Sequence, residues 1–365
     1  MRFHRGRVRL GFVMMGLFFT TVVFTGCSRL GPASISRGRA AYNESITRTD
    51  DEQMLMSIVK GRYGETYNML AVTAVAANIR FAATAGVQAG FGPSSSYDGN
   101  LVPFSGGVAY EENPTITYAP ASSAEYVRQL LTPIPLDILI MTMRATAFPG
   151  GVFLILVQRI NDIRNPDFLA PSGKPDPRFT RLLDLAEELS GAGLLYWAKH
   201  PGEGSEFDMV FANYAPAYSE EVGEFLALLG LPPPEDTSKD IVIPVRFALA
   251  AEEVDAIGIS TRSTLDLIEI LRATVQVPEE HADAGLAVSY PPVGMAGKGV
   301  RISSSPKRPE NAWLAVKYRD YWFSIEESDL ITKQLFRFTS MLWQASIAGG
   351  AGRQIAPVLT VPVSR

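Results

Sequence analysis

Cys27 is the single cysteine of the 365-residue chain, and its surroundings point to chemistry at its thiol. Four arginines come first, and an almost unbroken apolar run follows from Leu10 to Phe24. Gly26 then places a small residue directly before the cysteine. This order predicts a signal peptide over residues 1–26 that is removed, followed by acylation of the Cys27 sulfur. We therefore expect an exported chain that is tied to a membrane by lipid, with 27–36 as a lipidated linker.

Two alternatives to lipidation are a plain secretory signal with a coincidental cysteine and an uncleaved anchor. The apolar run is about fifteen residues long, shorter than the roughly 20 that a spanning helix needs. The sequence therefore favours removal. Ser28 follows the cysteine where some bacteria use Asp to keep lipoproteins in the inner membrane, which favours the outer membrane with the chain facing the periplasm.

The charge balance excludes some classes of partner. The chain has 33 Lys and Arg against 38 Asp and Glu, and loss of the four leader arginines would leave 29 basic side chains and a net charge of about −9. An acidic chain of this kind gives no counterion-release footprint for nucleic acid and no polybasic patch for anionic lipid. We expect the membrane contact to run through the lipid and expect no nucleic-acid partner.

The residues that could perform catalysis form no recognisable pattern. Outside the leader the histidines are His200 and His281, and neither belongs to an HExxH arrangement or has cysteine ligands nearby in the sequence. His281 follows Glu279-Glu280 and could join carboxylates around a metal, but an exposed acidic helix start is the favoured interpretation. We found no GxSxG elbow and no phosphate-binding loop. The sequence predicts no catalytic residue, no metal and no cofactor, and it leans away from an enzyme.

Hydrophobic spacing predicts both helices and strands. Apolar residues at helical spacing predict a helix over 37–62 that ends at Gly61 and Gly64. Small and β-branched residues between 67 and 118, with turn-forming residues at 94–100, predict a long β-hairpin.

Val152–Val157 is strongly apolar, and we predict a buried central strand there. The same reading of spacing, caps and turns predicts a further series of elements: a helix from Ser122 broken at Pro133 and Pro135, a helix over 177–191, strands over 194–199 and 207–211, a helix from Ser219, a strand over 241–249, a helix capped by Ser263 and Asp266, a hairpin over 314–325 that turns at Arg319-Asp320, a helix from Ser328 and a strand over 358–363.

Segment 165–177 holds four prolines and is the best candidate for a domain boundary. It would separate an N-terminal region, 37–165, from a C-terminal region, 177–365. Helices and strands do not alternate regularly in either region. We therefore predict an α+β fold with antiparallel strands and hairpins, arranged as two lobes.

Two hairpins keep a functional interpretation. The one over 314–325 is rich in aromatic residues, and strand alternation places Tyr321 and Phe323 on one face and Trp322 on the other. Trp322, Tyr321 and Trp313 are therefore candidate contacts for a protein partner or a glycan, although core packing is the favoured interpretation. The small-residue hairpin over 67–118 could join copies of the chain in a membrane channel. We expect an ordinary soluble sheet there, because it offers alanine where a membrane strand carries large apolar and girdle residues.

Several sequence blocks together resemble a family of uncharacterised lipoproteins of Gram-negative bacteria. The resemblance covers most of the chain after the leader and rests on these blocks: 51–55 leading into 61–66, Asn113–Tyr118, Gln129–Leu136, Val277–His281, Tyr318–Phe323 with Asp329-Leu330, and Pro357–Val363. It implies an outer-membrane address and an α+β fold, and it assigns no activity or site residue.

The sequence thus predicts a cell-envelope lipoprotein that binds or scaffolds without catalysis. The first alternative is a subunit of an oligomeric outer-membrane channel or export complex. The second is an envelope hydrolase that uses carboxylates.

Overall fold

The computed structural model describes most of the chain beyond residue 39, in these ranges: 40–66, 70–76, 79–87, 104–112, 115–120, 124–146, 149–165, 176–201, 207–248, 256–351 and 359–362. Residue contacts divide the chain into two compact units, Met1–Gln53 and Met54–Arg365. The described elements combine helices with sheets that are mostly antiparallel. The predicted α+β class is confirmed.

The first described helix spans residues 40–62, close to the predicted range. In the first unit, Arg48 and Glu52 form an ion pair one turn apart, with 3.2 Å between Nε and Oε1. In the second unit the helix ends as predicted, because Gly64 adopts φ +71° and Glu65 N donates to Lys60 O over 2.9 Å. A left-handed residue of this kind satisfies the last carbonyls of a helix, and glycine adopts it without steric cost.

The largest sheet of the second unit has six strands. Its order is β6-β5-β10-β9-β8-β7, in which β10 and β9 are parallel and the other neighbours are antiparallel. The strands are β5 (Val157–Ile160), β6 (Ile163–Arg164), β7 (Leu195–Lys199), β8 (Phe207–Phe211), β9 (Ile241–Phe247) and β10 (Ile257–Thr261). The proline-rich boundary segment falls largely outside the described residues. Strands from both sides of it share this one sheet.

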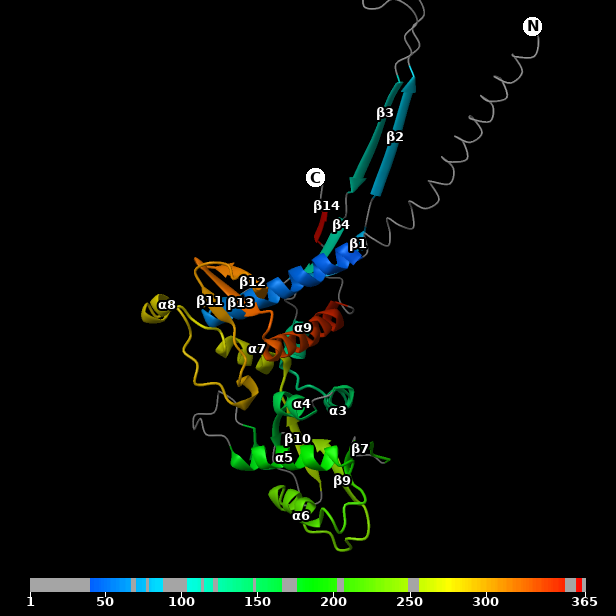
Figure 1. Ribbon diagram of the computed structural model, residues 1–365, viewed down its shortest axis with the longest axis vertical. Coiled ribbons are helices and arrows are strands. Elements are labelled where there is room, and N and C mark those ends of the chain that lie inside the picture. The colour runs from blue at the N-terminus through cyan, green and yellow to red at the C-terminus, as the bar shows by residue number, and fades with distance from the viewer. Residues whose placement is uncertain are drawn as a thin grey trace, which may run out of the picture. The chain divides into compact units, whose positions relative to one another are not determined.

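Helices α5 (Pro177–Gly191) and α6 (Ser219–Leu228) pack together, and α5 also contacts β7 (Figure 1). The α5 helix begins where the sequence predicts it, because the Asp176 side chain accepts from Arg178 N over 3.0 Å and Pro177 suits the first turn. Its inward face buries four apolar side chains: Phe179, Leu182, Leu185 and Leu189.

The prediction of a central strand at Val152–Val157 is wrong. Residues Pro149–Leu156 form helix α4, and the strand β5 begins only at Val157. An unbroken apolar run has no period that separates a strand from a buried helix. The deciding interaction comes from far away in the sequence. The Arg262 side chain, 1% exposed, donates from Nη1 to the carbonyls of Leu154 and Ile155 over 3.0 and 2.6 Å and so caps the end of the helix.

Two short helices precede α4. Helix α2 (Ala124–Leu131) ends before Pro133, and α3 (Leu136–Ala145) starts directly after Pro135. The predicted proline break is therefore confirmed. The residue that was expected to cap the first of these helices, Ser122, lies outside the described residues.

A three-stranded sheet carries the aromatic hairpin, in the order β11-β13-β12. Strands β12 (Ala312–Tyr318) and β13 (Tyr321–Glu326) turn at Arg319, which has φ +45°, as the sequence predicts. The capping box of Ser263 and Asp266 opens helix α7 and is likewise confirmed. The remaining elements of this part are α7 (Thr264–Ala273), α8 (Glu279–Asp283), the 3-10 turn η1 (Met295–Gly297), β11 (Ser303–Ser305) and α9 (Leu330–Ala351).

The small-residue region forms paired strands. Strand β1 (Leu70–Ala76) pairs with β4 (Thr115–Pro120), and the C-terminal β14 (Leu359–Pro362) joins β4 on its other side. Strand β2 (Ile79–Val87) pairs with β3 (Phe104–Glu112) without a register shift. The hairpin prediction is confirmed for these strands, whereas the predicted turn at 94–100 lies outside the described residues.

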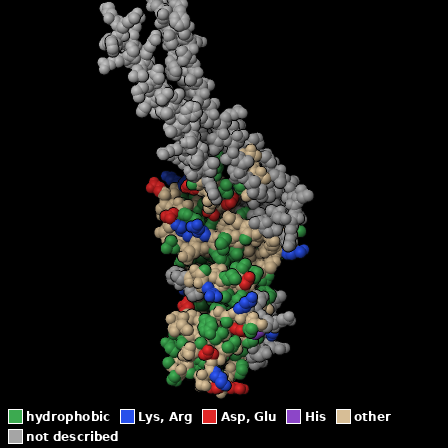
Figure 2. All heavy atoms as spheres, turned by 90° about the vertical axis from the view of Figure 1, so that its right-hand side faces the viewer, with side chains coloured by type: hydrophobic (Ala, Val, Ile, Leu, Met, Phe, Trp, Pro, Cys, Tyr) green, Lys and Arg blue, Asp and Glu red, His purple; other side chains and the backbone are tan. Residues whose placement is uncertain are grey.

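The described residues show a surface of mixed charge (Figure 2) and helices too short or too polar to cross a membrane. On the face that Figure 2 presents, acidic and basic side chains are interspersed among apolar ones. Within the described ranges no helix is long and apolar enough to cross a membrane. Cys27 and the apolar run before it lie outside those ranges.

Candidate ligand pocket

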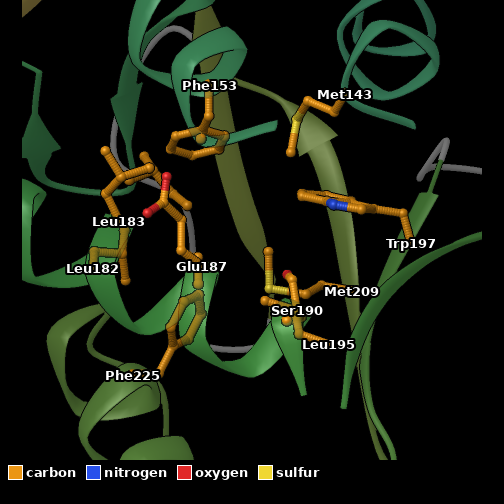
Figure 3. A pocket seen from close by; sticks show the side chains of 14 residues that line it. Met143, Phe153, Leu182, Leu183, Glu187, Ser190, Leu195, Trp197, Met209 and Phe225 are labelled. Carbon is orange, nitrogen blue, oxygen red and sulfur yellow. The ribbon is translucent and has the colours of Figure 1, made fainter. Parts of the chain in front are cut away.

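A pocket of about 430 Å³ lies between α5 and the β7–β8 strands, bounded also by α3, α4 and α6. We call it the α5 pocket. Figure 3 shows its walls. Most of the lining is apolar, and the residues are Met143, Gly150, Phe153, Ile160, Leu182, Leu183, Ala186, Glu187, Ser190, Gly191, Leu195, Trp197, Met209 and Phe225.

Helical and strand periodicity explain why these residues meet. On α5, Leu183, Ala186, Glu187 and Ser190 recur at spacings of three and four residues, so they form one stripe along the helix. On the sheet, Trp197 is the cross-strand partner of Met209. Directly paired residues share a face of the sheet. The pocket is therefore enclosed by one stripe of a helix and one face of two strands.

Glu187 brings the one carboxylate among the described lining residues. A Cβ atom built on Gly150 would lie only 1.8 Å from Glu187 Oε1, so the carboxylate occupies space that any other residue at 150 would fill. Gly150 belongs to the first turn of α4, where the helix dipole is positive and favours a negative group. Within the described part of the chain, no hydrogen bond or ion pair joins Glu187 to another residue.

His200 does not line this pocket. Its Nδ1 is 2.7 Å from Oδ1 of Asp208, which is 5% exposed. Asp208 is the strand neighbour of Met209, so it points to the opposite face of the sheet from the pocket. The pair satisfies a buried carboxylate, and none of the pocket-lining residues takes part in it.

His281 is less exposed than its sequence neighbours suggested. The acidic helix start is present as α8, but the His281 side chain is only 12% exposed. Its Nδ1 lies 2.8 Å from the hydroxyl of Tyr63, and its ring meets the Tyr321 ring edge-on at 5.3 Å. The acidic start itself is exposed at Glu279 and Glu280, as expected, whereas the aromatic hairpin covers the His281 ring. Among the described residues, no group of three or more His, Cys, Asp or Glu could hold a metal ion.

The three candidate contact residues of the aromatic hairpin are partly buried. The Trp313 ring packs edge-on against Phe336 at 5.7 Å. Trp322 lies under the guanidinium of Arg308, which is 5.3 Å from the ring centre, whereas Phe323 is fully buried. The three candidates belong to a different sheet from the α5 pocket, and none of them lines it.

Neither Glu187 nor Trp197 stands out in the sequence as a site residue. The apolar stripe on α5 was visible, but the wall of a pocket and the face of a packed core have the same spacing. The one available signal was an acidic residue beside Ala186 within that stripe, and surface carboxylates are too common for this to distinguish a site.

Comparisons with protein-family models, with curated proteins and with solved structures give no match.

Proposed function

We propose that this chain is a lipid-anchored binding component of the bacterial cell envelope, held at the outer membrane on its periplasmic side, and that it binds a small apolar molecule in the α5 pocket. The α5 pocket carries the proposal. Its volume of about 430 Å³ falls within the roughly 300–1,000 Å³ typical of small-molecule sites. The address is supported by the leader and Cys27.

A space of this size between packed elements needs an explanation. Protein interiors pack as densely as organic crystals, with few voids larger than a water molecule. Apolar walls give water few partners, so an apolar guest that enters this space displaces loosely held water and gains affinity. Phe153, Trp197 and Phe225 offer aromatic surface to that guest.

Binding is a better fit than carboxylate-dependent hydrolysis. Glycoside hydrolysis of the common kind needs two carboxyl groups that flank the scissile bond. Glu187 is the one carboxylate among the described lining residues of the α5 pocket. The lining therefore gives the hydrolase alternative no support.

The binding proposal can be tested by filling the pocket. Ala186→Trp places an indole in the space, and Ala227→Trp on the exposed side of α6 is the matched control. An apolar fluorescent probe, N-phenyl-1-naphthylamine, should bind the exported Cys27→Ala chain and the control but bind Ala186→Trp at least tenfold more weakly. Equal binding by both tryptophan variants, with circular dichroism unchanged, would reject the α5 pocket as the site.

The address has its own test. Cys27→Ala should move the protein from the membrane fraction to the soluble periplasmic fraction and abolish incorporation of labelled fatty acid. A Cys27→Ala protein that still takes up labelled fatty acid would show that lipidation at this residue is wrong.

The second candidate is a subunit of an oligomeric outer-membrane channel, and the pairing of β2 with β3 favours it. Each strand has nine residues, near the nine to eleven that cross a bilayer. The register pairs Phe81 with Tyr110 near one end and Val87 with Phe104 at the other. These four positions fall on the same face of the hairpin. The alternate positions include the pair Thr84 and Gly107. The length of the two paired strands is the observation that favours this candidate.

A further inference from the structure

Glu187 gives the α5 pocket a specific charge. Its lining contains no Lys, Arg or His among the described residues, and Glu187 has no ion-pair partner in that part of the chain. Glu187 is an exposed residue, so it lies at the mouth of the pocket rather than on its floor. A ligand that enters the pocket therefore brings its apolar part past a carboxylate whose charge is not neutralised by a neighbour.

The positive end of α4 lies beside this carboxylate but does not neutralise it. A helix N-terminus is equivalent to about half an elementary charge. Gly150 in the first turn of α4 leaves the room that the carboxylate occupies. The negative group therefore remains able to attract a full positive charge.

The opposite wall suits the apolar part of a ligand. In Figure 3, Trp197 lies across the hollow from Glu187 and is seen nearly edge-on, with Met143 above it and Met209 below it. Thioether sulfurs are polarisable and adapt to the shape of an apolar guest. A positive group at the mouth of the pocket would meet the carboxylate, and the attached apolar part would meet these side chains.

We infer that the ligand of the α5 pocket is an amphiphile with a small apolar body and a single cationic, amine-type head. The inference rests on the proposed binding function and adds the class of ligand. The apolar body fills the space lined by Phe153, Leu182 and Phe225, and the cationic head lies beside Glu187 at the mouth of the pocket. A neutral molecule of the same shape gains the apolar contacts alone, and an anionic one is repelled by the carboxylate.

Three probes with the same chain and different heads test the charge preference: n-octyltrimethylammonium, 1-octanol and n-octyl sulfate. Each is used to displace N-phenyl-1-naphthylamine from the exported Cys27→Ala chain. The ammonium probe should displace the dye at a concentration at least tenfold below that of 1-octanol, and the sulfate should be the weakest. Glu187→Gln should bring the ammonium probe to the level of 1-octanol and leave 1-octanol unchanged. Glu188→Gln, which removes the neighbouring acid outside the pocket lining, should keep the full preference.

The outcomes separate the two claims. If 1-octanol displaces the dye as well as the ammonium probe does, or if Glu187→Gln keeps the preference, the ligand class is wrong while an apolar binding function stands. If the Ala186→Trp variant binds dye and probes like the unfilled chain, the α5 pocket is not the site and both claims are rejected.

Discussion

Arg262 Nη1 lies 2.6 Å from the carbonyl oxygen of Ile155, so a guanidinium at the end of β10 caps the last turn of α4. The same helix supplies Gly150 and Phe153 to the α5 pocket. A side chain more than 100 positions away therefore holds one wall of the site.

Replacing Arg262 should destabilise the fold. Arg262→Met leaves the partly buried Ile155 carbonyl without its donor, whereas Asn165 still donates to the carbonyl of Leu154 over 2.7 Å. Each buried polar group that loses its partner costs about 1–3 kcal/mol. We expect the free energy of unfolding in urea to fall by about 3 kcal/mol, and Arg144→Met, at an exposed site on α3, should change it by less than about 0.5 kcal/mol. Equal effects of the two substitutions would refute the capping role.

The Tyr63 phenol should make stability fall at high pH. Burial, and after it the neighbouring Tyr318 phenol, raises the pKa of Tyr63 to about 12. The unfolded phenol has a pKa of about 10, so between these values the unfolded state loses its proton first. The stabilisation is thus complete below pH 10 and is lost as pH rises towards 12, by roughly 2 kcal/mol for this group.

Tyr63→Phe is the test, because it removes the phenol and keeps the ring. Urea unfolding between pH 9 and 11.5 should show a shallower loss of stability in Tyr63→Phe than in the unaltered chain. Tyr196→Phe, at an exposed tyrosine of β7, is the matched control. An identical pH dependence in Tyr63→Phe and the unaltered chain would contradict the shift.

Trp322 and Phe323 should differ in what their loss does. Phe323 is fully buried, and its ring centre lies 6.2 Å from that of Tyr63. Phe323→Ala should therefore cost about 3–5 kcal/mol of stability. Trp322 is partly exposed beneath Arg308, and Trp322→Ala should cost only about 1 kcal/mol. If Trp322 contacts an envelope partner, its alanine variant should also lose proteins that co-purify after mild detergent extraction. Unchanged stability together with unchanged co-purification would defeat both the packing and the contact interpretation.

The β2–β3 hairpin separates the two candidate functions. The binding proposal predicts that the Cys27→Ala chain is extracted without detergent as a monomer or small oligomer. Ala82 and Ala83 are consecutive positions of β2 and so belong to opposite faces of the strand. Cysteines at both positions should then react with a water-soluble maleimide. Labelling of Ala83→Cys from the lipid phase alone, in a ring that requires detergent, would instead favour the channel subunit.

Much of the fold follows from signals that act over a few residues. Local signals depend on neighbouring backbone groups and can therefore be predicted from the sequence. They include the capping box of Ser263 and Asp266, the break at Pro133 and Pro135 and the turn at Arg319. The proposed lipid address rests on a signal of the same local kind around Cys27, which lies outside the described residues.

What only the tertiary structure decided depends on groups that are distant in the chain. An apolar run such as Val152–Val157 can form a helix or a strand, and the remote Arg262 and Asn165 side chains satisfy the carbonyls that end the helix. The α5 pocket is also a tertiary feature. Leu183 and Trp197 have the same hydrophobic character whether they meet a neighbour or line a space. Spacing along a chain reports which face is apolar, and only the packing of separate elements determines whether that face is filled.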